Sequence, residues 1–300
     1  MESLCSFFKR VIELTAFKSA ITLILGNLRL SRHLKKPAFL IIALILHVNL
    51  QAQTRLMSWN LKDFGSSKTD EDISAIAEII KPYDIIAIQE VVAGPGGAKA
   101  VARLHEALNR KGTKWDYEIS PVTSGSSAHK AERYAFFWQA SKVNRVGKGW
   151  MEKKYGDLIE REPFYARFSV KGKKITLINF HAITKSQQPE TEIKYFKFFP
   201  MEYPGEALVF CGDFNVPQSH SVFNPIKKMG YISALIGQKT SLRQRCIADD
   251  CLASEFDNFY FDGKKLKLLS AGIIHFYRHF ANISDARKIS DHVPIFSTIE

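Results

Sequence analysis

Short apolar segments bounded by polar turns recur along most of this chain, and they restrict its fold more than any other feature. Apolar runs of five to seven residues are typical of β-strands. Helical periodicity is rarer and does not alternate regularly with these runs. We therefore predict strands over residues 55–60, 84–89, 134–139, 164–170, 175–180, 207–211, 256–261 and 294–299.

Only a few segments have the apolar periodicity of a helix. Asp70 is predicted to cap one that ends before Pro82, and residues 98–108 are predicted to form a second. Residues 190–199 and 219–229 are weaker candidates, the latter followed by Gly230 in the position of a C′ glycine. Many strands with few helices predict an α/β fold in which two sheets form a sandwich and the helices lie outside.

Composition sets limits on the class of protein. The 46% hydrophobic and 24% charged residues exclude a disordered chain, a collagen-like repeat and a polytopic membrane protein. Residues 54–300 contain no repeat or long linker and are predicted to form one domain. They hold 35 Lys and Arg against 28 Asp and Glu residues, a net charge of +7 that favours acidic partners.

The first 53 residues have the order of a leader with a secretory signal peptide. Arg32, Lys35 and Lys36 precede an apolar run over residues 38–48, and a short polar stretch with Ala52 follows. The run is too short for a stable membrane span, so we predict cleavage near Ala52 and a secreted or periplasmic protein. The alternative is an uncleaved N-terminal anchor.

Export would expose the cysteines to oxidising conditions. Cys246 and Cys251 are close enough in sequence to close a small surface loop there. Cys211 ends an apolar run and is expected to be a buried, inert thiol.

Polar residues gather at the ends of the predicted strands, where Gly, Pro or Ser would be more usual. Each of them alone has a structural explanation, such as a turn or a solvated strand end. The residues at these positions are Asn60, Glu90, His181, Asp213 with Asn215, Asp257, and Asp291 with His292.

As a set, these residue types suit metal-dependent phosphodiester hydrolysis. The three carboxylates of Glu90, Asp213 and Asp291 and the two amides supply hard oxygen ligands for Mg²⁺ or Ca²⁺. Two histidines can transfer protons near neutral pH. Glu132 and Asp257 are available to orient them.

The ordered series of motifs resembles the endonuclease/exonuclease/phosphatase superfamily, in its deoxyribonuclease I-like branch. The resemblance spans the chain from Arg55 to its end, and seven segments in order make it specific. The segments are Ser58-Trp59-Asn60-Leu61, Ile88-Gln89-Glu90-Val91, Glu132-Arg133-Tyr134, Asn179-Phe180-His181-Ala182, Gly212-Asp213-Phe214-Asn215, Phe256-Asp257-Asn258 and Ser290-Asp291-His292-Val293-Pro294.

The resemblance implies a four-layer sandwich with two central, mostly antiparallel sheets and a site at one edge. It implies Mg²⁺ or Mn²⁺, with Ca²⁺ as a further ion, and ligands Glu90, Asn60, Asp291 and Asp213. It also implies that His181 paired with Glu132 is the general acid and that His292 paired with Asp257 is the general base. Asp213 would also position water, and Asn60 and Asn215 would hold phosphate oxygens.

Within the superfamily, the paired histidine His181 favours the deoxyribonuclease branch, and DNA, with RNA as a second candidate, is the predicted substrate of a monomer. Backbone phosphates are expected to meet the basic residues Lys130, Arg133, Lys185, Arg243 and Arg245. The segment over residues 121–130 is predicted to be a groove-facing loop. The family's groove-inserting arginine is absent, since Val91 and Val92 follow Glu90.

Two alternatives remain at this point. A sphingomyelinase-like or phosphoinositide-cleaving enzyme would use the aromatic segment over residues 194–199 at a membrane, although burial of one face on a sheet is the preferred interpretation. A non-catalytic exported binding protein is disfavoured because every catalytic residue type is present.

Overall fold

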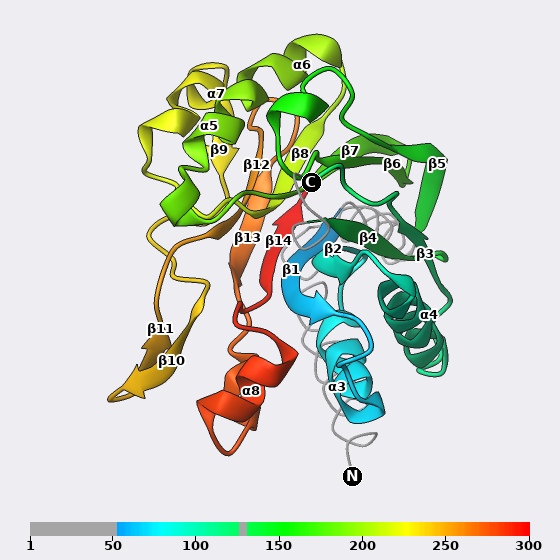
Figure 1. Ribbon diagram of the computed structural model, residues 1–300. Coiled ribbons are helices and arrows are strands. Elements are labelled where there is room, and N and C mark those ends of the chain that lie inside the picture. Colours follow the sequence, from blue (N-terminus) through cyan, green and yellow to red (C-terminus); the bar gives the residue numbers. More distant parts are fainter. Residues whose placement is uncertain (1–52, 126–130) are drawn as a thin grey trace, which may run out of the picture. The chain divides into compact units, whose positions relative to one another are not determined.

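Two six-stranded sheets form the centre of the unit Thr54–Glu300 (Figure 1). The computed structural model describes residues 53–125 and 131–300. Sheet 1 has the order β13 (Leu268–Ile273), β14 (Ile295–Ile299), β1 (Thr54–Phe64), β2 (Ile85–Val92), β4 (Glu132–Gln139) and β3 (Trp115–Ile119). Sheet 2 has the order β5 (Val143–Met151), β6 (Phe164–Val170), β7 (Lys173–His181), β8 (Leu208–Asp213), β12 (Asp257–Asp262) and β9 (Tyr231–Ser233).

Each sheet contains one parallel pair among antiparallel neighbours. In sheet 1 the parallel pair is β1 with β2, and in sheet 2 it is β7 with β8. Every other pairing within the two sheets is antiparallel. The expected pair of mostly antiparallel sheets is therefore confirmed.

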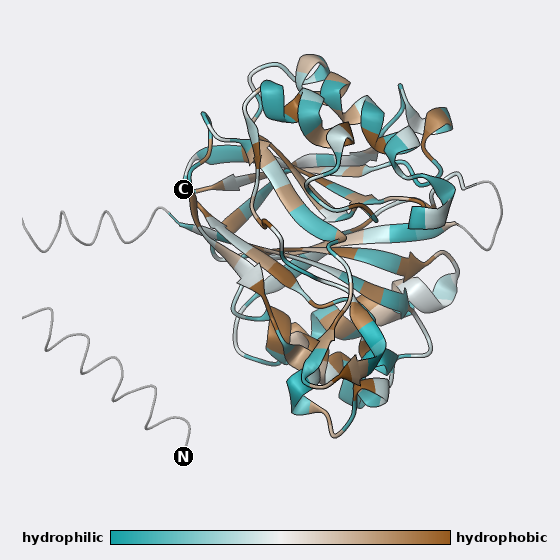
Figure 2. Cartoon of the chain, turned by 90° about the vertical axis from the view of Figure 1, so that its left-hand side faces the viewer, coloured by the Kyte–Doolittle hydropathy of each residue, from teal (hydrophilic) through white to brown (hydrophobic). Residues whose placement is uncertain are grey.

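Helices cover the outer face of each sheet, giving four layers. One apolar core lies between sheet 1 and its helices, a second between the sheets, and a third between sheet 2 and its helices. Along β8, Leu208 and Phe210 enter the third core while Val209 and Cys211 enter the second, as the two-residue period of a strand requires. Figure 2 shows the hydrophobic residues along the strands and on the sheet-facing sides of the helices. The helices are α3 (Asp70–Ile80), α4 (Pro95–Asn109), α5 (Glu190–Ile193), α6 (Phe199–Glu202), α7 (Asn224–Lys228) and α8 (Ile283–Ile289), with 3-10 turns η1 (Gly156–Leu158), η2 (Lys185–Gln187), η3 (Lys194–Phe198), η4 (Ser221–Phe223) and η5 (Phe276–His279).

All eight predicted strands exist, as β1, β2, β4, β6, β7, β8, β12 and β14. The strands that the pattern missed in the two sheets are β3, β5, β9 and β13, which are the four edges. An edge strand buries less of its surface, and β5 is mostly exposed or half-buried along its length. Its sequence therefore lacks the apolar run that identifies a central strand.

The predicted helix starts were wrong in detail. Thr69, not Asp70, caps α3, because its hydroxyl accepts from the Asp72 backbone while the Asp72 carboxylate accepts from the Thr69 backbone. Helix α4 begins at Pro95 rather than at residue 98, so the Gly94–Gly97 stretch is its cap and first turn. Proline suits the first helical position because its fixed φ is already helical.

The weaker helix candidates are broken into shorter pieces. Residues 190–199 form α5, η3 and the start of α6, and residues 219–229 form η4 and α7. Gly230 follows α7 with a φ of 104°, as expected of a C′ glycine. Phe196 and Phe199 are fully buried against sheet 2, which confirms the preferred interpretation of the aromatic segment.

A buried carboxylate, that of Asp84, anchors sheet 1 at the edge where β1 and β2 begin. Asp84 accepts from the Arg55 backbone and guanidinium, at 2.9 and 3.2 Å, and from Lys142 at 3.0 Å. Burial opposes ionisation, but these hydrogen bonds outweigh it and lower the pKa of Asp84.

A separate two-stranded hairpin, β10 (Leu242–Ile247) with β11 (Asp250–Leu252), is closed by a Cys246–Cys251 disulfide. Cys211 is a buried thiol, as predicted, and burial raises its pKa. Within residues 53–125 and 131–300, no helix is long and apolar enough to cross a membrane. The predicted signal peptide, its cleavage position near Ala52, residues 126–130 of the predicted loop and Lys130 lie outside the described residues.

Candidate active site

The two parallel strand pairs bring four predicted residues to one edge of the sandwich. Asn60 and Glu90 lie near the carboxyl ends of β1 and β2, and His181 and Asp213 end β7 and β8. The antiparallel neighbours arrive at the same edge with their first residues, Glu132 on β4 and Asp257 on β12, and His292 lies just before β14. The site is therefore made where strand ends of both sheets meet.

Glu90 is directed into the site by an irregular backbone. The pairing of β2 with β4 shifts between Ile88 and Val91, and Glu90 has a φ of 59°. A bulge re-aims a side chain, and a positive φ is uncommon at a non-glycine residue within a strand. The Glu90 carboxylate accepts from Asn60 Nδ2 at 2.8 Å and from the Asp63 backbone N–H at 3.0 Å.

The first histidine is held by a carboxylate from the other sheet. His181 Nδ1 lies 2.9 Å from a Glu132 oxygen, and both side chains are buried. Burial disfavours the charged imidazole, but Glu132 outweighs it and raises the pKa of His181. Its Nε2 is directed toward Asp213 Oδ2, at 3.5 Å, and Glu90 Oε1, at 3.9 Å.

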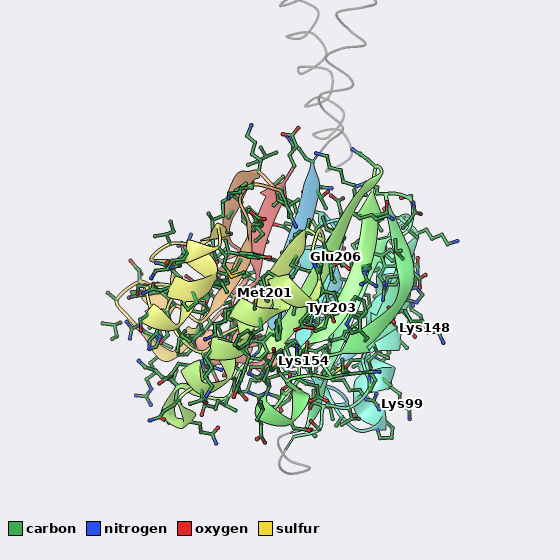
Figure 3. All side chains as sticks on the ribbon, turned by 90° about the horizontal axis from the view of Figure 1, so that it is seen from above. Lys99, Lys148, Lys154, Met201, Tyr203 and Glu206 are labelled. Atoms are coloured by element: carbon green, nitrogen blue, oxygen red, sulfur yellow. A yellow bond between two sulfur atoms is a disulfide. The ribbon has the colours of Figure 1, made fainter. Side chains whose placement is uncertain are left out.

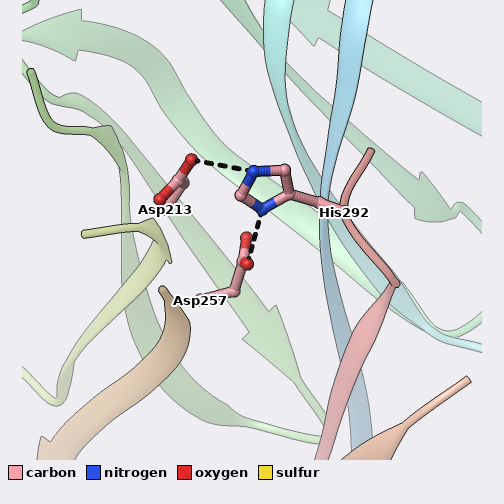
Figure 4. Close-up of side chains that lie close together, drawn as sticks. All are labelled: Asp213, Asp257 and His292. Carbon is pink, nitrogen blue, oxygen red and sulfur yellow. Dashed lines mark hydrogen bonds and ion pairs between the residues drawn. The ribbon is translucent and has the colours of Figure 1, made fainter. Parts of the chain in front are cut away.

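The second histidine is held in the same way (Figure 4), but here the histidine lies beside sheet 1 and its carboxylate lies on sheet 2. His292 Nδ1 lies 2.7 Å from Asp257 Oδ2, and its Nε2 lies 3.6 Å from Asp213 Oδ2. Burial opposes protonation here too, but Asp257 and Asp213 together raise the pKa of His292 to about 10. The two carboxylates of the protein therefore favour the imidazolium form of His292.

Asp213 is the shared centre of these contacts. Its Oδ2 faces both histidines and accepts from Asn60 Nδ2 at 3.2 Å. Its Oδ1 accepts from the Asn215 backbone N–H at 3.0 Å, and Asn215 has a φ of 54°. The Asn215 side chain donates to the Ala182 carbonyl. This tight turn fixes the carboxylate so that one oxygen points into the site.

Two groups of side chains could hold a divalent metal, and they share Asp213. The ligand atoms of Asp213, Asp257 and His292 lie within 4.8 Å of one another. On the other side lies the Glu90 carboxylate, with Asn60 beside it, whose Nδ2 donates to Glu90 and whose Oδ1 accepts from the Lys62 backbone. An all-oxygen set fits Mg²⁺ or Ca²⁺, whereas an imidazole must be neutral to bind a metal.

Comparison with known proteins agrees with this geometry. Residues 57–292 match the model of the Endonuclease/Exonuclease/phosphatase family. The chain belongs to this family. It is 28% identical to a deoxyribonuclease of Thioalkalivibrio sp. over 89% of this chain and 77% of the relative. It is also 28% identical to deoxyribonuclease-1-like 2 of Mus musculus, over 82% of this chain and 91% of the relative.

Solved structures of this family share the fold. An endonuclease/exonuclease/phosphatase family protein from Bacteroides thetaiotaomicron aligns with a TM-score of 0.61 at 16% identity, covering 83% of this chain and 97% of the other. A zebrafish (D. rerio) TDP2 complexed with a single-strand DNA product aligns with a TM-score of 0.58 at 13% identity, covering 83% and 99%. At these identities the likeness shows the fold alone.

The other predicted residues of this family member lie around the centre. Asp291 faces Arg287 at 3.3 Å and Lys62 at 3.9 Å, and its side chain is 29% exposed. The Arg133 guanidinium donates hydrogen bonds to the Ala93 and Ser120 carbonyls and so links two loops beside the site. A phosphate contact by Arg133 stays a prediction. Lys185 lies in η2, and Arg243 and Arg245 lie on β10.

Sequence reasoning missed several residues that hold the site together. The half-buried Arg161 donates to the His181 carbonyl at 3.0 Å and to that of Ala182, and it lies 3.8 Å from Glu132. The charged run before β6, residues 160–162, was the signal that could have indicated it.

Two hydroxyl groups have a similar supporting role. Ser290 donates to the Asn60 carbonyl and accepts from the His292 backbone. Thr240 Oγ1 accepts from the backbone N–H of Asp257 at 3.0 Å. Serine and threonine are too common in turns for either residue to be recognised from sequence.

Proposed function

We propose that this protein is a secreted, divalent-metal-dependent, sequence-nonspecific endonuclease that hydrolyses DNA. The observation that carries the proposal is the pair of buried histidine and carboxylate dyads that face one shared carboxylate, Asp213, from opposite sides. One dyad can donate a proton while the other accepts one, as hydrolysis of a phosphodiester requires.

In this mechanism each histidine acts through Nε2, because Nδ1 is occupied by its carboxylate. His292 accepts the proton of the attacking water, and His181 donates one to the departing 3′-oxygen. Glu132 and Asp257 hold each ring in one tautomer and orientation. Asp213 orients the water between the rings. Asn215 holds a phosphate oxygen with the N–H that does not bind the Ala182 carbonyl, and Asn60 can do the same only if it gives up its bond to Glu90 or Asp213.

The metal is assigned to the oxygen donors Glu90, Asn60, Asp213 and Asp291. Glu90 and Asp291 are 26% and 29% exposed, so an ion that keeps part of its water shell can reach them. The bound cation would stabilise charge on the phosphoryl group and lower the pKa of His292 toward the range of a general base.

DNA is the substrate favoured by the relatives, which are named deoxyribonucleases. The net charge of +7 over residues 54–300 and the basic residues Lys130, Lys185, Arg243 and Arg245 suit contacts with backbone phosphates. Such contacts position a duplex without reading its sequence. The Cys246–Cys251 disulfide suits an oxidising compartment and so supports export through the predicted leader.

Lipid phosphodiesters are the next candidate substrates, and fewer features of the structure support them. The aromatic rings of residues 194–199 pack on Tyr155 and on sheet 2. Lys154, Met201 and Tyr203 lie on the same face (Figure 3), and Met201 is 59% exposed. Together with Leu158, which is 54% exposed and three residues from Tyr155, this methionine is still a small apolar surface for binding a membrane.

A plasmid-nicking assay on residues 54–300 tests the proposal. Supercoiled plasmid is incubated with Mg²⁺, with and without Ca²⁺, with an EDTA control. We expect nicking that requires metal and that falls about 10²–10⁴-fold in His181→Ala. Glu90→Gln is expected to weaken Mg²⁺ binding in calorimetry. Intact plasmid from folded protein under all metal conditions would refute the endonuclease proposal and direct the search to lipid phosphodiesters.

A further inference from the structure

A buried polar bridge connects the two sheets directly beneath the site. Gln89 on β2 and Asn179 on β7 are both completely buried. Gln89 Nε2 donates to Asn179 Oδ1 at 2.6 Å and to Ser58 Oγ at 3.0 Å. Asn179 Nδ2 in turn donates to the Ile88 carbonyl at 3.0 Å. Asn179 of sheet 2 is thus hydrogen-bonded both to a side chain of sheet 1, that of Gln89, and to the backbone of sheet 1 at Ile88.

The position of this bridge in the chain is informative. Gln89 immediately precedes Glu90, and Asn179 lies two residues before His181. The Ile88 and Ala135 carbonyls, which both accept from Asn179, lie where the β2–β4 pairing shifts. Asn179 therefore satisfies backbone groups at the bulge that turns Glu90 into the site.

The surrounding interface cannot supply this precision by itself. The core between the sheets is lined mostly by apolar side chains, and apolar contact is not directional. Hydrogen bonds have narrow distance and angle preferences. A buried amide pair also disfavours displacement of one sheet against the other, because an unpaired amide in an apolar core is unfavourable.

Three functional pairs of the site join one sheet to the other. Glu132 of sheet 1 meets His181 of sheet 2, and Asn60 of sheet 1 meets Asp213 of sheet 2. The third pair, His292 beside β14 with Asp257 on β12, crosses in the same way. A small slip between the sheets would lengthen all three contacts together.

We propose that Gln89 and Asn179 are positioning residues that fix the placement of the two sheets at the active site. They touch neither substrate nor the reacting atoms, and they act through Glu90 and His181. The inference deepens the proposed nuclease function and rests on it for the kinetic part of its test.

The test uses Gln89→Met and Asn179→Leu, which keep the approximate volume of each side chain. Gln139→Met is the matched control. Gln139 is also a buried glutamine on sheet 1. It donates to the Lys81 and Tyr83 carbonyls, which lie in the connection between α3 and β2, so its contacts do not join the two sheets. All variants are checked for folding by circular dichroism.

Two readouts separate positioning from general stability. In plasmid nicking, we expect kcat to fall about 10–100-fold in both bridge variants with KM unchanged, and to stay within twofold in the control. In proton NMR of the metal-free protein, the imidazole Nδ1–H resonance of His181 should shift or disappear in the bridge variants and persist in the control.

The outcomes discriminate between the two proposals. Wild-type kcat and an unchanged His181 resonance in Gln89→Met would overturn the positioning role, and so would equal losses of kcat in the bridge variants and Gln139→Met. The wild-type protein could also fail to cut DNA while the His181 resonance is lost only in the bridge variants. That result would support the positioning role and refute the nuclease function. Gln89→Met removes fewer hydrogen bonds than Asn179→Leu and decides the test if the latter does not fold.

Discussion

Asp257→Asn tests the chemistry of the site most directly. The substitution keeps the shape of a side chain that is only 2% exposed, and the backbone contact with Thr240 is unaffected. It removes the carboxylate 2.7 Å from His292 Nδ1, which is the strongest of the attractions that hold the imidazole proton. Asp213, at 3.6 Å from Nε2, remains.

The expected loss follows from these contacts. His292 keeps one carboxylate neighbour but loses the one that fixes its tautomer, so we expect kcat for plasmid nicking to fall about 10²–10³-fold, inside the usual range for acid–base catalysis. Because Asp257 acts only through His292, the double variant with His292→Ala should be no slower than His292→Ala alone. Asp262→Asn, at the other end of β12, is the control and should retain wild-type kcat.

Two results would refute this reasoning. One is an Asp257→Asn enzyme within threefold of wild type, which would mean that the dyad does not orient the base. The other is a double variant whose loss is the product of the two single losses, which would mean that Asp257 and His292 act independently.

The remaining predictions concern stability. Asp84→Asn should lower the free energy of unfolding by about 1–2 kcal/mol at pH 7, since its cationic partners are partly exposed. Because the pKa of Asp84 is lowered by folding, this difference should persist in urea titrations down to the ordinary aspartate value of about 3.9 and then shrink as the pH falls through the lower folded-state pKa, and a difference that stays constant well below the ordinary value would contradict it. Gly212→Ala should destabilise by about 3 kcal/mol, because its φ is 136° and a Cβ would lie 1.9 Å from a β7 carbonyl oxygen, whereas Gly205→Ala, with open space around it, should lose about 1 kcal/mol. Equal losses in these two variants by urea denaturation would show that the close approach of β7 is not the cause. Removing the Cys246–Cys251 disulfide with Cys246→Ser should lower stability by about 2 kcal/mol from loop entropy, to be measured against wild type with and without reductant. A wild-type protein that reductant does not destabilise would argue against a stabilising disulfide.

The sequence predicts central strands and misses edges for a physical reason. A central strand of this sandwich is buried on both faces, so β8 is entirely buried and appears as an unbroken apolar run. The edge strand β13 is half-buried or exposed at every position. Its pairing with β14 comes from the backbone, which leaves no signature in side-chain polarity.

The same distinction applies to the site. Glu90, His181 and Asp213 are recognisable because a charged or polar group directly at the end of an apolar strand is unusual. Arg161 is not recognisable, since it lies in a charged loop and is drawn into the site only by carbonyl contacts with His181 and Ala182. Its burial depends on the packing of residues distant in sequence.

The arrangement of the sheets explains why so many scattered residues converge. In each sheet the single parallel pair sends two carboxyl ends to the same edge, and the antiparallel neighbours bring their amino ends there. No sheet contains a complete dyad, since Glu132 lies on sheet 1 and His292 just before its strand β14, while His181 and Asp257 lie on sheet 2. Catalytic geometry in such a fold is a property of the interface between the sheets. Substitutions that shift this interface should therefore lower kcat before they measurably lower stability.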